Sequence, residues 1–145
     1  MSISTTETPT TPATVQTSPS RTSASSTPTS TVSTTTGPGG VTVECPAANG
    51  TTYISQGQKF FRLCATEHTP ENGAVDVSQV KAQSMVECID ACTSFNTGGS
   101  DNEKCVGVNW IYRKAQGESN SFCWLKGSVG KVESWDGCEA GLLVR

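Results

Sequence analysis

The spacing of the seven cysteines constrains this chain most, above all the pair Cys88 and Cys92 within SMVECIDACTSF. Ser84 followed by Glu87 matches a capping box, which marks the start of a helix, and the segment 96–99 (NTGG) predicts its end. The apolar residues between these signals recur every three or four positions and define one face: Met85, Cys88, Ile89, Cys92 and Phe95. Both thiols therefore face the core.

Two thiols on one helical face suit a metal site, redox chemistry or disulfides. Structural zinc sites show two close pairs of ligands, whereas Cys105 and Cys123 stand alone and His68 is the only histidine. A redox pair would favour C-x-x-C at a helix N-terminus rather than two cysteines along its body. Cysteines one turn apart do not easily bridge each other, so each is expected to bond to a different strand. We expect no metal and no cofactor.

Several segments read as strands. CVGVNWIY, residues 105–112, alternates apolar side chains on one side, and SFCWLK, residues 121–126, follows after the polar loop RKAQGESN. This arrangement predicts an antiparallel hairpin. Further strands are expected at 59–64 and 141–145, with a short one near 51–54. The predicted fold class is α+β: a small disulfide-rich domain with one helix packed on an antiparallel sheet. Asp90, like Glu87, is expected on the solvent side of that helix.

The N-terminal part has a different composition. Of its first 36 residues, 23 are Ser or Thr and four are Pro, and all nine aromatic residues lie between Cys45 and Cys138. Such a segment buries too little apolar surface to offset the entropy of ordering it, and it is typical of an O-glycosylated, mucin-like stalk. We therefore expect a disordered stalk or linker over 1–40 and a folded domain over 41–145.

The expected compartment is extracellular or cell-surface, because a stalk and a cysteine-rich domain both belong to the secretory pathway. The sequence contains no run of 18 apolar residues and no signal-peptide pattern at its N-terminus. We expect a signal or anchor upstream of Met1, or a true start that lies earlier. Asn49-Gly50-Thr51 is an N-glycosylation sequon. The net charge of −3, with both signs mixed along the chain, offers no basic stripe for a nucleic acid.

Four segments in order resemble the PAN/Apple domains, especially those of secreted and cell-surface proteins of filamentous fungi. They are CPAANGTTYISQGQKFFRLC, VECIDAC, CVGVNW and CWLK, and the resemblance that they carry spans essentially all of residues 45–126. The resemblance implies a central helix whose C-x3-C cysteines join two different strands. Carried onto this chain, it implies the disulfides Cys88–Cys123, Cys92–Cys105 and, as in the fungal version, Cys45–Cys64.

Cys138 departs from that pattern and is left unpaired. In blood-plasma Apple domains the first and last cysteines join, which would instead pair Cys45 or Cys64 with Cys138. The odd thiol is either buried and inert, or links two chains or another part of a longer protein.

The sequence predicts no enzyme. His68 has no nucleophile motif around it and is interpreted as a loop residue. GSVGK, residues 127–131, lacks the first glycine and the final Ser or Thr of a phosphate loop, so we interpret it as a turn after the second hairpin strand.

Recognition of a protein or polysaccharide is the predicted function, since PAN/Apple domains are known as protein- or carbohydrate-binding modules. Trp110 and Trp124 lie in predicted strands and are expected to pack in the core or against the sheet. Trp135, in the polar segment KVESWDG, is the first candidate for ligand contact, followed by Tyr112 and Arg113. The alternative function is a structural wall or matrix component, cross-linked through stalk glycans or Cys138.

Overall fold

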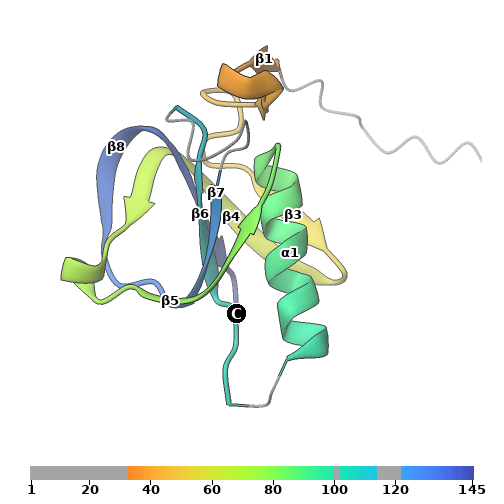
Figure 1. Cartoon of the computed structure of the whole chain (residues 1–145), viewed down its shortest axis with the longest axis vertical. Helices are drawn as coiled ribbons and strands as arrows, with labels where there is room; N and C mark the ends of the chain where they lie inside the picture. Colours follow the sequence, from red (N-terminus) through yellow and green to blue (C-terminus); the bar gives the residue numbers. More distant parts are fainter. Residues whose placement is uncertain (1–32, 100–101, 114–121) are drawn as a thin grey trace, which may run out of the picture. The chain divides into compact units, whose positions relative to one another are not determined.

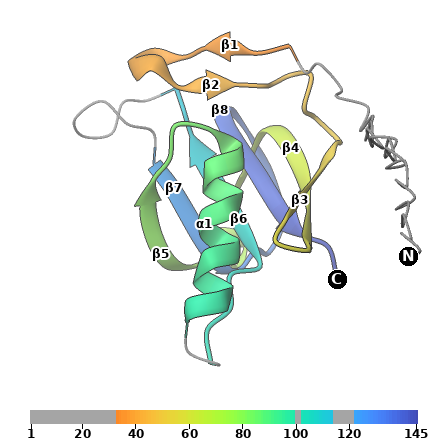
Figure 2. The same cartoon turned by 90° about the vertical axis from the view of Figure 1, so that its right-hand side faces the viewer.

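The computed structural model describes residues 33–99, 102–113 and 122–145, so residues 1–32 of the expected stalk and most of the hairpin loop lie outside the described residues. Within them lie one α-helix, two short 3-10 helices and eight strands (Figures 1 and 2). In chain order these are β1 (Thr35–Thr36), η1 (Pro38–Gly40), β2 (Thr42–Val43), β3 (Thr52–Ser55), β4 (Gln58–His68), η2 (Pro70–Asn72), β5 (Val75–Lys81), α1 (Met85–Gly98), β6 (Gly107–Ile111), β7 (Phe122–Ser128) and β8 (Val132–Leu143).

Six strands form one antiparallel sheet in the order β3-β4-β8-β6-β7-β5, and β1 pairs with β2 separately. The predicted hairpin is confirmed, because β6 and β7 pair antiparallel with Trp110 opposite Cys123. Helix α1 lies against one face of this sheet (Figure 2). The α+β prediction, one helix on an antiparallel sheet, is therefore confirmed.

The capping box begins α1 as predicted. The Ser84 hydroxyl accepts a hydrogen bond from the Glu87 backbone N–H at 3.1 Å, and the Glu87 carboxylate accepts one from the Gln83 N–H at 2.8 Å. The expected stop at 96–99 is confirmed, because α1 ends at Gly98 and Gly99 is its C-cap. The Asn96 side chain bonds to both backbone groups of Cys105, at 2.7 and 2.9 Å, instead of capping its own helix.

The main core lies between α1 and the sheet. Trp110 is fully buried in it, and its indole N–H donates to the Ala82 carbonyl at 2.9 Å. Gly141 permits the close approach of the helix, since a Cβ there would lie only 2.7 Å from the terminal carbon of Met85. Met85, Cys88, Ile89 and Cys92 are buried as the helical pattern predicts.

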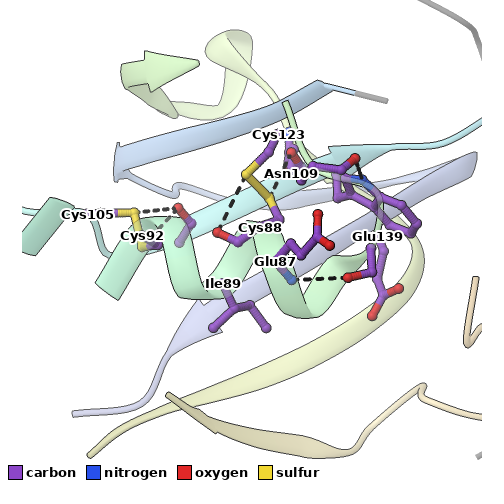
Figure 3. The surroundings of a disulfide bond; sticks show 12 residues. Glu87, Cys88, Ile89, Cys92, Cys105, Asn109, Cys123 and Glu139 are labelled. Atoms are coloured by element: carbon purple, nitrogen blue, oxygen red, sulfur yellow. Dashed lines mark hydrogen bonds between the residues drawn. A yellow bond between two sulfur atoms is a disulfide. The ribbon is translucent and has the colours of Figure 1, made fainter. Parts of the chain in front are cut away.

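Three disulfides fasten the domain, and Figure 3 shows the two that hold the helix. Cys88 is bonded to Cys123 of β7, and Cys92 to Cys105 just before β6. The third bond joins Cys45 to Cys64. These are the same three pairs that the PAN/Apple resemblance implies. Cys138 is the free cysteine and is buried.

The C-terminal part of β4 and the N-terminal part of β8 curl over the face of the sheet opposite α1 (Figure 1). We call these segments, residues 65–68 and 132–137, the overhang. In β4 the register shifts between Cys64 and Thr66, and in β8 the overhang ends at Gly137, whose positive φ of 96° favours glycine. The sheet face beneath the overhang is hereafter the concave face.

The overhang corrects two predictions. His68 was expected in a loop, yet it ends β4 and is buried, because β4 continues four residues past Cys64 and pairs with β8. The polar segment around Trp135 was interpreted as a loop, yet it is strand, since β8 extends back to Val132. Its partner is the same extension of β4, whose length the sequence pattern did not indicate.

One strand was missed from the sequence and one residue was misplaced. The missed strand is β5, whose pairing with β7 is irregular, with register shifts around Asp76 and Ser78. Asp90 was placed on the solvent side of α1, but its carboxylate accepts hydrogen bonds from Ser55 at 2.6 Å and Tyr53 at 3.3 Å. Asp90 therefore fastens the edge strand β3 to the helix.

A candidate binding groove on the concave face

Strand alternation decides which side chains reach the concave face. In β7, Cys123 and Leu125 are buried in the core against α1, so Trp124 and Lys126 face the other way. In β6, Trp110 faces the helix, and Asn109 and Ile111 therefore face the overhang. The concave face thus carries an aromatic ring, an ammonium group and an amide.

Asn109 connects this face to the overhang. Its side-chain oxygen accepts from the His68 backbone N–H at 2.9 Å, and its amide N–H donates to the His68 carbonyl at 2.8 Å. The paired bonds complete the backbone hydrogen bonding of a buried strand end. They also fix how far the overhang stands from the sheet, and so keep a space open between the two.

That space consists of two adjoining pockets. The inner pocket has a volume of about 250 Å³ and is lined by Glu67, His68, Pro70, Asp76, Asn109, Ile111, Trp124, Lys126 and Trp135. The outer pocket has a volume of about 390 Å³ and is lined by Ile111, Arg113, Trp135 and Asp136. Because Ile111 and Trp135 line both, we treat the pockets as one groove, called the concave groove below.

The structure brings two of the three predicted ligand contacts together. Trp135 is 37% exposed and Arg113 lies beside it in the outer pocket. Tyr112 lies apart from them, since its ring packs against Trp110 at a centroid distance of 5.2 Å on the helix side. Trp124 is half-buried and lines the inner pocket, on the face away from the main core.

The charges in the groove are mostly paired. Lys126 forms an ion pair with Asp76, and its ammonium nitrogen lies 6.0 Å from the centre of the Trp124 ring. Arg113 forms an ion pair with Asp136. Glu67 has no ion pair among the described residues, and burial together with the Glu133 carboxylate raises its pKa.

His68 closes the inner end of the groove as a neutral ring. Burial lowers its pKa, and the nearby Lys126 ammonium lowers it further, although backbone groups of Gly141 and Val129 act in the opposite direction. Neither ring nitrogen makes a hydrogen bond of good geometry within the described residues, and Trp124 Nε1 is likewise buried without a partner. The groove therefore contains polar atoms that the protein leaves unsatisfied.

A separate buried cluster of charges lies on the other side of the sheet. The Arg62 guanidinium contacts Glu139 and Glu44, each at 2.6 Å, and Glu139 is fully buried. Burial raises the pKa of Glu139 to about 7, with Arg62 opposing the rise. Glu139 also lies near the sulfurs of Cys45 and Cys64, but these are bonded to each other and so do not form a thiolate metal site.

The sequon remains a prediction that the geometry permits. Asn49 is exposed, and its side-chain oxygen accepts from the Cys64 backbone N–H at 2.9 Å. Glycosylation modifies the amide nitrogen of an exposed asparagine, and the exposure of Asn49 meets that requirement.

Several groove residues were missed from the sequence, namely Glu67, Asp76, Asn109 and Lys126. A usable signal existed for Lys126, because a strand that directs Cys123 toward the helix must direct residues 124 and 126 away from it. For Glu67 and Asp76 no such signal existed, since both depend on the overhang and on the irregular strand β5.

Comparisons with protein-family models, with curated proteins and with solved structures found no match to this chain. Three disulfides are typical of a protein that folds in an oxidising or extracellular compartment. Among the described residues, no helix has both the length and the apolar character needed to cross a membrane.

Proposed function

We propose that this domain is an extracellular recognition module of PAN/Apple type, presented on its Ser/Thr-rich segment, and that its ligand occupies the concave groove. The observation that carries the proposal is the groove itself. Exposed aromatic surface from Trp135 adjoins charged and polar side chains in a concave site, which is the usual composition of a binding pocket. The ordered cysteine segments and the disulfide pairs agree with the PAN/Apple assignment.

The rigidity of the domain also supports a binding role. Two disulfides fix α1 to the sheet, and Asn109 fixes the overhang, so the groove is formed before a ligand arrives. A preformed site reduces the entropy cost of association. A binding domain benefits from such rigidity, because its surface must already match the ligand when the two meet.

The alternative role is a structural component that is cross-linked through Cys138. The burial of this thiol weighs against that route, since burial raises its pKa well above its ordinary value and thereby suppresses the reactive thiolate. Non-reducing electrophoresis of the secreted protein tests it. Covalent oligomers that disappear in Cys138→Ser would support the structural role.

The binding proposal is tested with the secreted protein immobilised on a resin. Extracellular polysaccharide and protein fractions are passed over the wild type, the Trp135→Ala variant and a reduced, unfolded sample. We expect retention by the wild type and its loss in the other two. Equal retention by wild type and Trp135→Ala would show that the concave groove is not the site.

A further inference from the structure

The charges of the concave groove restrict its ligand. Lys126 is neutralised by Asp76 and Arg113 by Asp136, so Glu67 remains as the one carboxylate of the lining without an ion pair among the described residues. A ligand with sulfate, phosphate or uronate groups would be repelled by the Glu67 carboxylate, and both cations, Lys126 and Arg113, already form ion pairs. The whole chain adds a net charge of −3. The groove therefore favours an uncharged ligand.

The apolar part of the lining consists of side chains that can pack against a sugar ring. Trp124 from β7 and Trp135 from β8 line the same inner pocket, and Ile111 lies between the two pockets. The C–H face of a pyranose ring packs on indole in the way that other apolar groups do. A peptide could also pack against these rings, but its backbone N–H and C=O groups would require a row of hydrogen-bond partners. On the overhang side of the groove, the backbone of β4 and β8 is already paired within the sheet, so it does not provide such a row.

The polar part of the lining matches hydroxyl groups. Glu67 and Asp76 are acceptors, Lys126 is a donor, and Trp124 Nε1 is a buried donor without a partner among the described residues. A ring with several hydroxyls can donate to the carboxylates and accept from the donors at the same time.

The length of the groove indicates more than one ring. The pockets of about 250 and 390 Å³ adjoin at Ile111 and Trp135, so a ligand that fills both must continue past Trp135. Among the described residues, the charged groups of the outer pocket are Arg113 and Asp136, which pair with each other, and this suits the next unit of a chain better than a second independent ligand.

We propose that the concave groove binds a neutral oligosaccharide, with one sugar unit in the inner pocket beneath the overhang and the next unit beyond Trp135. The proposal rests on the proposed function and narrows it to one ligand class. It predicts that affinity grows from a monosaccharide to a disaccharide or trisaccharide, because only the longer chains reach both pockets.

The test uses the full chain and soluble neutral probes: glucose, mannose, and short laminari-, cello-, manno- and chito-oligosaccharides, with heparin as the anionic probe. Binding is measured by titration calorimetry and by the change in tryptophan fluorescence. At least one neutral series is expected to bind, with an affinity that added salt leaves unchanged. Trp135→Ala is expected to weaken it by about tenfold or more, as stacking on an exposed indole is worth at least ~1.4 kcal/mol.

One variant controls for loss of fold. Ile54→Ala removes an apolar side chain that is 61% exposed and lines neither pocket, and it should bind like the wild type. A second variant, Glu67→Gln, tests the charge argument, because it keeps the volume of the lining and removes its unpaired charge. Heparin should bind Glu67→Gln more tightly than it binds the wild type, and an unchanged discrimination against heparin would contradict the charge argument.

The outcomes separate the ligand class from the function. Binding of a neutral series, lost in Trp135→Ala, supports the inference. Binding of heparin but of no neutral probe, or capture of a protein that depends on Trp135 while every sugar fails, overturns the oligosaccharide and leaves the recognition function standing. Failure of all sugars together with no Trp135-dependent retention of any protein overturns both.

Discussion

Replacing Glu139 by glutamine is expected to change how the stability of the domain depends on pH. Glu139 is fully buried, shares Arg62 with Glu44, and has one carboxylate oxygen without a hydrogen-bond partner among the described residues. With all three side chains ionised, the two carboxylates exceed the single guanidinium and leave an excess negative charge in a largely buried site. This is the situation in which a buried carboxyl retains its proton.

The size of the effect follows from the pKa. Burial raises the pKa of Glu139 from 4.5 to about 7 in the folded protein, which at about 1.4 kcal/mol per pH unit corresponds to about 3 kcal/mol. Below 4.5 the carboxyl is protonated in both states and this contribution is fully present. As pH rises toward 7 the unfolded chain releases the proton before the folded one does, so stability falls. Above about 7 the contribution is lost.

The assay compares urea unfolding of the wild type and Glu139→Gln across this range, since the glutamine still accepts from Arg62 but does not ionise. The difference in unfolding free energy should shift by about 3 kcal/mol in favour of the variant between pH about 4.5 and about 8. Glu103→Gln, which removes an exposed carboxylate outside this cluster, is the matched control and should leave the difference flat. If the unfolding free energies of the wild type and Glu139→Gln differed by the same amount at every pH, the reasoning would be refuted.

Three further predictions concern other buried groups. Since burial and Lys126 lower the pKa of His68, the unfolded chain takes up a proton first as pH falls below about 6.5, and thermal melts should show a loss of stability there that His68→Gln lacks. Replacing both Cys88 and Cys123 by alanine opens a loop with a sequence separation of 35 and should cost about 4 kcal/mol in urea unfolding, while an unchanged midpoint would contradict the loop-entropy account. Cys138 should react with a thiol reagent only after denaturation, and rapid labelling of the native protein would show that it is accessible.

The helix half of the fold could be predicted from sequence because its signals are local. The capping box at Ser84 and the spacing of Cys88 and Cys92 identify a helix with a buried face, and the alternation around Trp110 identifies the strand beneath it. The overhang could not be predicted in this way. Its strands are polar and half-exposed, and they are strands only because β4 and β8 pair with each other far beyond the apolar segments that mark them.

The groove, too, could be predicted only where local sequence signals mark its residues. Trp135 was selected for its polar surroundings and Arg113 for its place at a strand end, and both line the outer pocket. The inner pocket depends on contacts between distant segments, such as Asn109 with the backbone of His68, and no spacing in the sequence encodes them. Tyr112 was selected by its place at a strand end, but alternation along β6 directs it to the helix side.

The three disulfides are unevenly placed, and this has a consequence for motion. None of their cysteines lies in the overhang, which is held to the rest of the domain by hydrogen bonds and by the Arg113–Asp136 ion pair. The overhang should therefore unfold locally before the rest of the domain does. Backbone amides of 66–68 and 132–134 should exchange with deuterium well before those of α1. A polymer chain could then enter from the side during a brief opening, without needing a free end.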